Sequence, residues 1–300
     1  MQNKPHVDSW YAATANLKLD LPPLEGATST DVCIIGAGYT GLSAAIHLRQ
    51  AGYKVTVLEA NKVAWGASGR NGGHVGTGQR AGQEELEKLV GLDHARALWQ
   101  LSLEAVDTVC KLIEEHSIDC ELKHGNLHVA SKAGDIASMP AEVEHLQKLY
   151  NYQQLRYVDA TELKSMTSGQ GFGGGLLDTG SRHLHPLNYA LGLARVAIES
   201  GATIHEGSRV LSYSEGSQVT VRTDRGEVRA KFLVLACNGY LEKLEPRAAG
   251  RIMPINNYLL ATEPLGEDLA RRLIRDDTSM SDSRFVINDW KLSADNRLLF

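Results

Sequence analysis

The hydrophobic pattern of the chain predicts a parallel βαβ unit near its beginning. Residues 31–35, DVCII, form a short apolar run of the kind found in fully buried parallel strands. The sequence LSAAIHLRQAG, which follows GAGYTG, is rich in helix formers and ends at Gly52, a residue suited to a helix end. Residues 53–60, YKVTVLEA, contain consecutive β-branched residues and predict the second strand.

Further along, the pattern predicts first helices and then short strands. Helices are expected at 84–116 with a break at Gly91, at 135–150, at 160–166 and at 186–200, and a strand is expected at 121–131. From residue 202, the sequences ATIHEG, RVLSYSEG, QVTVRTDRG and EVRAKFLVLAC predict a small antiparallel meander that returns to a buried strand at 232–236. Another strand is expected at 255–264. The predicted fold class is therefore α/β.

Composition excludes several classes of protein. The chain has 300 residues, of which 31 are basic and 36 acidic, and its net charge of −5 argues against a nucleic-acid partner or an anionic membrane surface. Its longest apolar runs, such as FLVLAC, are too short to span a membrane, and its first residues do not resemble a signal peptide. The four cysteines are scattered and form no C-x-x-C pair, so a cytoplasmic location is expected.

A glycine motif lies between the first predicted strand and the helix. Gly36, Gly38 and Gly41 have the G-x-G-x-x-G spacing of dinucleotide-binding turns. In such turns the first glycine permits a tight turn, the second lets a pyrophosphate approach the backbone, and the third allows close packing of helix on strand. Glu59 ends the next strand, where a carboxylate accepts the hydroxyls of an unphosphorylated ribose. This context predicts a dinucleotide site and not a simple glycine turn.

A second glycine-rich stretch, WGASGRNGGHVG at 65–76, indicates which dinucleotide is bound. A simple NAD domain would continue with a helix here, whereas a bare backbone lets a large flat ring lie against it. An isoalloxazine ring fits that description, and FAD is therefore predicted. Ser68 and Asn71 are expected to contact the phosphate or the ring, and Arg70 to place a positive charge beside them. The alternative, a mobile linker, is disfavoured by the apolar residues at both ends of the stretch.

These motifs resemble a known family. The segments CIIGAGYTGLSAAIHLRQAGYKVTVLEA, GASGRNGGHV, SWYAATAN, SRHLHPLNYALGLARVAIESGATIHEGSRV and PINNYLLATEPL are similar to the FAD-dependent amine oxidoreductases of the D-amino-acid oxidase type, which include sarcosine and glycine oxidases. Within that family the chain looks most like the enzymes that oxidise gamma-glutamylputrescine in polyamine breakdown. The resemblance implies a Rossmann-like FAD-binding domain with a β-meander, together with a substrate domain built on an antiparallel sheet.

The resemblance also implies domain boundaries and cofactor contacts. The FAD-binding domain would take residues 1–83 and 155–250, and the substrate domain would take 84–154 and 251–300. The family has a further strand and helix near its C-terminus, so a C-terminal part is expected to be missing after DNRLLF. The expected cofactor contacts are Gly36, Gly38 and Gly41 at the pyrophosphate, Glu59 at the ribose, Ser68, Gly69, Arg70, Asn71, Gly72 and Gly73 at the pyrophosphate and flavin, Val210 at the adenine, and Ala236, Asn238 and Gly239 at the nucleotide.

The expected reaction removes hydride from the carbon beside the nitrogen of a small amine. Water then hydrolyses the imine to an aldehyde and ammonia, and oxygen or another acceptor reoxidises the flavin. The amine must react in its neutral form, which a dry pocket favours, because the nitrogen of an ammonium ion has no free lone pair. His74, at the end of the glycine stretch, and Tyr258, on an expected strand, are the candidate catalytic residues. A hydrogen-bonded structural histidine and a packing tyrosine are the alternative interpretations.

Other functions remain open at this point. An oxidase of N-methyl or simple amino acids would need an arginine for the carboxylate, and Arg251 and Arg284 are candidates. A non-catalytic flavin-binding remnant is the alternative from a different class. His183 and His185 alternate on an extended stretch, but metal ions need three or four ligands, so no metal site is expected.

Overall fold

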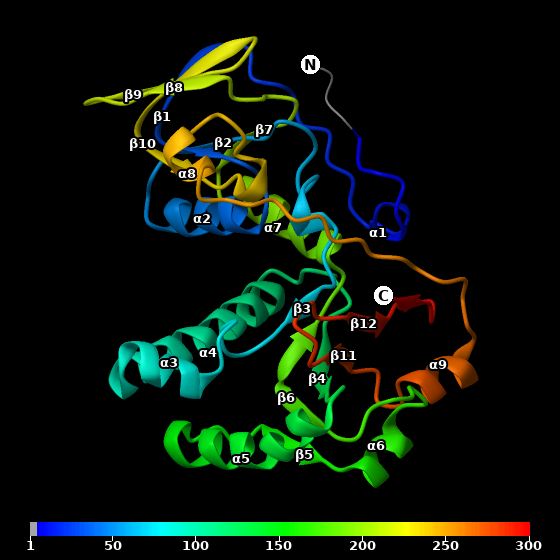
Figure 1. The fold of residues 1–300 in the computed structure, drawn as a ribbon. Helices are drawn as coiled ribbons and strands as arrows, with labels where there is room; N and C mark the ends of the chain where they lie inside the picture. Colours follow the sequence, from blue (N-terminus) through cyan, green and yellow to red (C-terminus); the bar gives the residue numbers. More distant parts are fainter. Residues whose placement is uncertain (1–4) are drawn as a thin grey trace. The chain divides into compact units, whose positions relative to one another are not determined.

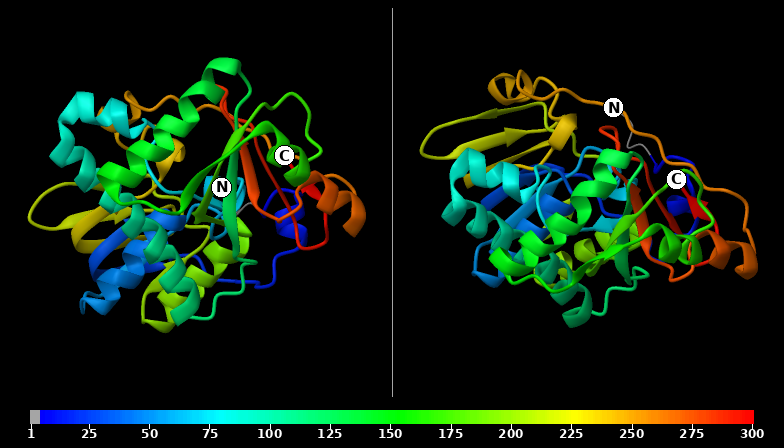
Figure 2. Two further views of the ribbon diagram at one scale, coloured as in Figure 1. Left: turned by 90° about the horizontal axis from the view of Figure 1, so that it is seen from below. Right: turned by 60° about the horizontal axis from the view of Figure 1, so that its bottom comes forward.

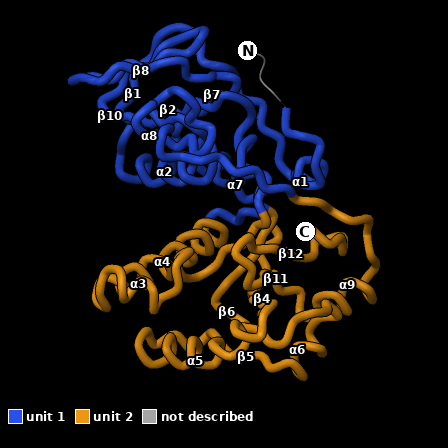
Figure 3. Tube along the Cα trace, viewed as in Figure 1, with its two compact units in different colours: residues 1–71, 116–120, 186–258 blue, residues 72–115, 121–185, 259–300 orange. Residues whose placement is uncertain are grey.

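The computed structural model describes residues 5–300, which form two compact units (Figure 3). Among these residues, unit 1 contains 5–71, 116–120 and 186–258, and unit 2 contains 72–115, 121–185 and 259–300. The chain passes repeatedly from one unit to the other, so each unit is assembled from segments that are distant in the sequence.

Unit 1 is built on a sheet with the strand order β7-β2-β1-β10-β9-β8. Its strands are β1 (Gly26–Ile35), β2 (Val55–Leu58), β7 (Thr203–His205), β8 (Ser212–Ser214), β9 (Val219–Arg222) and β10 (Gly226–Leu235). The neighbouring strands β7, β2, β1 and β10 are parallel to one another. Strands β8, β9 and β10 form the predicted antiparallel meander, whose hairpin is yellow in Figure 2. The prediction that ATIHEG belongs to this meander was wrong, because β7 pairs in parallel with β2 at the opposite edge.

Two helices pack side by side on the sheet of unit 1 (Figure 1). They are α2 (Tyr39–Gln50), which is the predicted crossover helix, and α7 (Pro186–Glu199), which is buried along most of its length. Short elements complete the unit: α1 (Trp10–Ala13), α8 (Pro246–Ala249) and the 3₁₀ turns η1 (Ala67–Gly69) and η2 (Asn238–Tyr240). Ile34 of β1 and Leu42 and Ile46 of α2 are fully buried, so apolar contact holds the helix on the strand.

Unit 2 is built on a second, mostly antiparallel sheet with the order β13-β12-β11-β4-β6-β3, in which β5 also pairs with β6. Its strands are β3 (His74–Val75), β4 (Lys123–Val129), β5 (Leu155–Val158), β6 (Gly175–His183), β11 (Ser279–Asp282), β12 (Asp289–Leu292) and β13 (Leu298–Leu299). One pair, β11 with β4, is parallel. The strand expected at 255–264 is not formed; this segment is largely exposed and makes one isolated bridge, from Ala261 to Leu299.

The predicted helices of unit 2 are confirmed. They are α3 (Gln83–Val90), α4 (Leu92–Glu115), α5 (Ala133–Tyr150) and α6 (Ala160–Met166), whereas α9 (Glu267–Leu273) was not predicted. Gly91 separates α3 from α4 because its φ of +82° is one that L side chains rarely adopt. Within residues 5–300, none of the helices is long and apolar enough to cross a membrane.

A buried carboxylate, Asp178 of β6, fixes the chain just beyond the glycine-rich stretch. It is 8% exposed and accepts hydrogen bonds from Thr77 Oγ1 at 2.8 Å, Tyr152 Oη at 2.5 Å, Ser181 Oγ at 2.6 Å and the amide of Gly180 at 2.8 Å. Several neutral donors therefore compensate the buried charge. The contact with Thr77 ties the end of the glycine-rich stretch to the central part of the sheet.

Replacing this carboxylate is expected to destabilise unit 2. The Asp178→Ala variant leaves several buried donors without an acceptor, and we expect a loss of about 3 kcal/mol in the free energy of unfolding. Urea unfolding followed by far-UV circular dichroism measures it. Asp107→Ala is the control, since Asp107 is an exposed residue of α4 paired with Lys111, and its loss should be within about 0.5 kcal/mol. Equal unfolding midpoints for the two variants would contradict the assigned role.

Candidate functional site

The glycine motif of unit 1 brings the backbone of α2 against the end of β1. A Cβ at Gly41 would collide with the carbonyl oxygen of Gly36, so the helix packs on the turn with no side chain between them. Gly36 has a φ of +107°, and a Cβ there would lie 2.6 Å from the carbonyl oxygen of Ala236, just after β10. The predicted mechanical roles of Gly36 and Gly41 thus have a geometric basis, and Ala236, whose contact with the nucleotide stays a prediction, lies beside the motif.

The N-terminus of α2 has the features of an anion-binding site. Its N-cap is Gly38, which makes no side-chain cap, and no acidic residue lies in the first turn. The hydroxyl of Ser68 accepts a hydrogen bond from the amide of Tyr39 at 3.1 Å, and a Cβ at Gly38 would meet only this side chain. The positive end of the helix dipole and its amide groups favour a phosphate at such a position.

Glu59 lies at the end of β2, beside the motif. Its carboxylate accepts hydrogen bonds from the amides of Ala37 and Asn61, each at 2.9 Å. Burial raises the pKa of the Glu59 carboxyl, while these backbone donors act in the opposite direction. A carboxylate oxygen has more than one lone pair, so Glu59 can also accept the hydroxyls of a ribose.

The loop after β2 is held in place by its own polar side chains. Asn71 donates from its amide to the carbonyls of Ala67 and Ser68, each at 3.1 Å, and so closes the turn η1. Arg70 donates to the carbonyl of Trp65 at 2.8 Å and lies over the Trp65 ring at 4.3 Å from the centroid. The structure therefore gives Asn71 and Arg70 roles in holding the loop, and their contacts with the phosphate or the flavin stay predictions.

The turn after β10 packs on the same loop. Asn238 begins η2 with a φ of +49°, and Tyr240 of this turn would lie 3.0 Å from a Cβ at Gly66. A Cβ at Gly239 would make only an ordinary contact, with Pro254 Cβ at 3.9 Å, so the fold of this chain by itself does not require glycine there. Val210 is partly buried against the core of the sheet. Sequence reasoning missed Tyr240, whose ring explains Gly66.

Gly72 and Gly73 lie against protein groups of unit 2. The carboxylate of Asp289 occupies the space that a Cβ at Gly72 would need, and Lys291 Nζ lies 2.8 Å from the Cβ position of Gly73. The carbonyl of Leu184 also meets Gly73, whose φ is +73°. The backbone contact and the positive φ are sufficient to require glycine at position 73, whereas a side chain at position 72 would have to displace the side chains of Asp289 and His74. No motif in the sequence indicated Asp289 or Lys291, because they are far along the chain from the glycines.

His74 of β3 lies close to an acid of β12, Asp289. Its Nδ1 lies 3.4 Å from Asp289 Oδ2, and its Nε2 is buried without a hydrogen-bond partner among residues 5–300. Tyr258, the other candidate, is 83% exposed and lies outside any strand. His183, which pairs opposite His74 in the sheet, has its ring nitrogen Nε2 at 2.8 Å from the backbone carbonyl of Asp277.

The two histidines considered for a metal site are buried as neutral rings. Burial, followed by the charge of Lys291, lowers the pKa of His183 to about 3 and that of His185 to about 4. Among residues 5–300, no group of three His, Cys, Asp or Glu side chains is arranged to hold a metal ion.

The described residues fit the adenosine diphosphate part of FAD. Gly36, Gly38 and Gly41 form a cradle without side chains of their own at the N-terminus of α2, where the Ser68 hydroxyl accepts from the amide of Tyr39, and Glu59 supplies the ribose acceptor. The three glycines and Glu59, with Ser68, would hold the cofactor.

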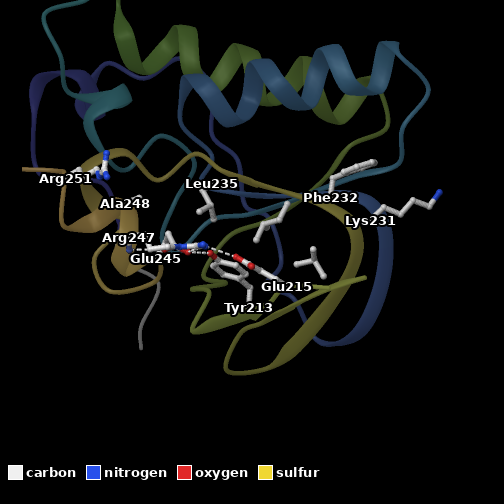
Figure 4. Close-up of a pocket in the computed structure, with 11 residues that line it drawn as sticks. Tyr213, Glu215, Lys231, Phe232, Leu235, Glu245, Arg247, Ala248 and Arg251 are labelled. Carbon is white, nitrogen blue, oxygen red and sulfur yellow. Dashed lines mark hydrogen bonds and ion pairs between the residues drawn. The ribbon is translucent and has the colours of Figure 1, made fainter. Parts of the chain in front are cut away.

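Unit 1 also contains a pocket of about 660 Å³ on the meander, separate from this cradle (Figure 4). Phe232 and Leu235 of β10 lie on it, and Arg247 contacts Glu245 and Glu215 beside Tyr213. None of the residues predicted to contact the cofactor lines this pocket.

Comparison with known sequences shows extensive similarity to one family. The family model described as DAO, FAD dependent oxidoreductase, matches residues 31–300. Gamma-glutamylputrescine oxidoreductase of Escherichia coli (strain K12) is 38% identical over 296 residues, which cover 98% of this chain and 69% of that protein. A probable oxidoreductase named OrdL from Haemophilus influenzae is 38% identical over 301 residues, which cover 98% of this chain and 70% of that protein.

Solved structures share the fold at low sequence identity. Glycine oxidase from Geobacillus kaustophilus matches 90% of this chain and 70% of its own, with a TM-score of 0.69 and 18% identity. L-Amino acid deaminase from Proteus myxofaciens matches 95% of this chain and 61% of its own, with a TM-score of 0.72 and 19% identity. These likenesses confirm the predicted fold class. The family match and the 38% identical relatives show that this chain belongs to the DAO family of FAD-dependent oxidoreductases.

Proposed function

We propose that this chain oxidises a small primary amine related to gamma-glutamylputrescine, with FAD as cofactor. The observation that carries the proposal is the 38% identity to gamma-glutamylputrescine oxidoreductase across 98% of the chain, which includes the cradle and the glycine-rich stretch. The carbon beside the nitrogen loses hydride, the imine formed is hydrolysed to an aldehyde and ammonia, and oxygen or another acceptor takes the electrons.

The residues of the chain bind and orient the cofactor and the substrate, while FAD would supply the capacity to accept a hydride. Gly36, Gly38 and Gly41 admit the pyrophosphate to the end of α2, and Glu59 fixes the ribose. The chain must also provide a neutral amine, because a protonated nitrogen has no lone pair to assist loss of hydride. His74 is the residue that we assign to this proton, since its Nε2 is buried and makes no hydrogen bond within residues 5–300.

The arginines that a carboxylate substrate would require are placed unfavourably for that role. Arg284 pairs with the buried Asp282 at 3.3 Å, and Arg251 lines the meander pocket described above. An amino-acid substrate needs a cation for its carboxylate close to the reacting carbon. These placements favour a primary amine over an N-methyl or simple amino acid. Tyr258 is retained as a residue for substrate contact, because its exposed hydroxyl is available to a ligand.

The function is tested by following flavin absorbance under anaerobic conditions. Gamma-glutamylputrescine and putrescine should bleach the oxidised flavin of the purified, FAD-loaded chain, and sarcosine and glycine should do so at least about tenfold more slowly. A chain that holds FAD but is bleached by none of these amines would contradict the activity and leave the cofactor assignment intact. That outcome would support the non-catalytic flavin-binding remnant, whereas a purified chain without flavin absorbance that takes up no added FAD would contradict the cofactor assignment as well.

The cradle is tested by a pair of matched glycine substitutions. Gly38 and Gly82 are both helix N-caps without a side-chain cap, but only Gly38 belongs to the proposed cradle. We expect Gly38→Ala to weaken FAD binding at least about tenfold, or about 1.4 kcal/mol, because its methyl group would come within 2.8 Å of the Ser68 hydroxyl and displace it from the end of α2. Gly82→Ala places its methyl group in open space and should bind FAD as the unmodified chain does.

Titration of the FAD-free chain with FAD, followed by quenching of flavin fluorescence, measures both affinities. Circular dichroism spectra establish that each variant is folded. Equal dissociation constants for Gly38→Ala and the unmodified chain would show that the pyrophosphate does not lie at this end of α2.

A further inference from the structure

Strands β12 and β3 of unit 2 meet through their side chains although three strands separate them in the sheet. Strands β11, β4 and β6 lie between them in the hydrogen-bonded order. Nevertheless, Asp289 at the start of β12 lies 3.4 Å from His74 at the start of β3. The sheet therefore curls, so that these two strands approach each other (Figure 1). An acid and a histidine distant in sequence are placed together in this way.

Two charged residues of β12 lie on the glycine-rich stretch. Asp289 and Lys291 are two positions apart on the strand, so their side chains leave the same face. Asp289 covers the backbone at Gly72, and Lys291 covers it at Gly73. Lys291 is 4% exposed and donates a hydrogen bond to the carbonyl of Leu184. Lys291 thus holds Leu184, whose amide donates to the carbonyl of Gly73 at 2.9 Å, directly before His74, while Asp289 lies beside Gly72.

Several charged and titratable groups lie around His74. Asp289 and Lys291 face the segment from β12, and the register places His183 of β6 opposite His74. Behind His183 lie Asp277, which contacts its ring through the main chain, and Lys123 and Arg271, which pair with the Asp277 carboxylate. Burial lowers the pKa of His183 to about 3, so this ring is neutral near pH 7. In these contacts, the acid nearest to the His74 ring is Asp289.

The orientation of the His74 ring determines which nitrogen can accept a proton. Nδ1 is the ring nitrogen nearer to Asp289, and a carboxylate, which offers only acceptors, favours the neutral ring form with hydrogen on that nitrogen. The other nitrogen, Nε2, then has its lone pair available. It is also the nitrogen that is buried without a hydrogen-bond partner among residues 5–300.

We propose that Asp289 is a positioning residue that holds the proton of His74 on Nδ1, so that Nε2 can take a proton from the ammonium group of the substrate. This inference rests on the function proposed above. One N–H bond of the ammonium breaks, one N–H bond forms at Nε2, and the positive charge moves to the imidazolium beside Asp289. The neutral amine retains the electron pair, and the proton leaves to water when His74 is next deprotonated. Lys291 fixes the backbone before His74 and takes no part in the transfer.

The first test needs neither FAD nor substrate. Nitrogen NMR of the chain labelled with ¹⁵N-histidine distinguishes the two neutral ring forms, and comparison with His74→Gln assigns the His74 signal. We expect the form protonated at Nδ1 in the unmodified chain and a shift of the population toward Nε2–H in Asp289→Asn, since an amide can donate as well as accept. The Nε2–H form in the unmodified chain would overturn the proposal.

The second test compares flavin reduction by the amine at two pH values. We expect Asp289→Asn and His74→Gln to lower kcat/KM about 100-fold at pH 7, and to approach the unmodified chain at a pH above about 10.4, where the amine is already neutral. The double variant should be no slower than His74→Gln alone, because Asp289 acts through His74. An equal loss at both pH values would mean a purely structural role and would overturn the proposal.

Matched variants separate the proton role from general disturbance of unit 2. Lys291→Met should lower the rate by the same factor at both pH values, because Lys291 only fixes the backbone; a loss confined to pH 7 would assign the proton role to the lysine and overturn our assignment. Asp295→Asn, at an exposed residue paired with Arg297, should leave both measurements unchanged. If no amine reduces the flavin of the unmodified chain, the proposed function fails, whereas the NMR experiment still decides the role of Asp289.

Discussion

The structure of unit 1 depends on the close approach of helix α2 to the turn that follows β1. Gly41 lies on the carbonyl of Gly36, so a side chain at Gly41 would force the helix away from the turn, and a side chain at Gly36 would collide with the carbonyl of Ala236 after β10. Because β1 pairs with β2 on one side and β10 on the other, this contact sets the helix end relative to both neighbours. Glu59 and Ala236, which follow those strands, are thereby gathered at the end of α2, where an anion is favoured.

The glycines at positions 38, 72 and 73 are explained by two different kinds of neighbour. At Gly38, only the flexible hydroxyl of Ser68 lies near the missing Cβ, so the space is available to a ligand. At Gly72 and Gly73, the missing side chains make room for groups of the protein itself, from β12 and from Leu184. A glycine-rich stretch is therefore insufficient evidence for a cofactor; the neighbours of each glycine decide what it is for.

Unit 2 contains buried charged side chains in its sheet, among them Asp178 and Lys291. Asp178 is satisfied by four neutral donors, and Lys291 is bound to a backbone carbonyl. Buried charged groups are costly unless they are hydrogen-bonded, and a surrounding that meets this need also holds them rigidly. Both residues fix the same segment, Asp178 at Thr77 and Lys291 at Gly73, and so hold His74 between two anchored points.

The sequence by itself determined the βαβ unit, the order of most helices and strands, and the cradle from Gly36 to Glu59. These features depend on local spacing, since a strand, a turn and a helix that follow one another must meet. Two predictions were wrong, the strand at 255–264 and the place of ATIHEG in the meander. Strand pairing is decided by partners remote in sequence, which no local pattern indicates. Only the tertiary structure could pair His74 with Asp289, because the curl of a sheet brings together two residues that no local pattern connects.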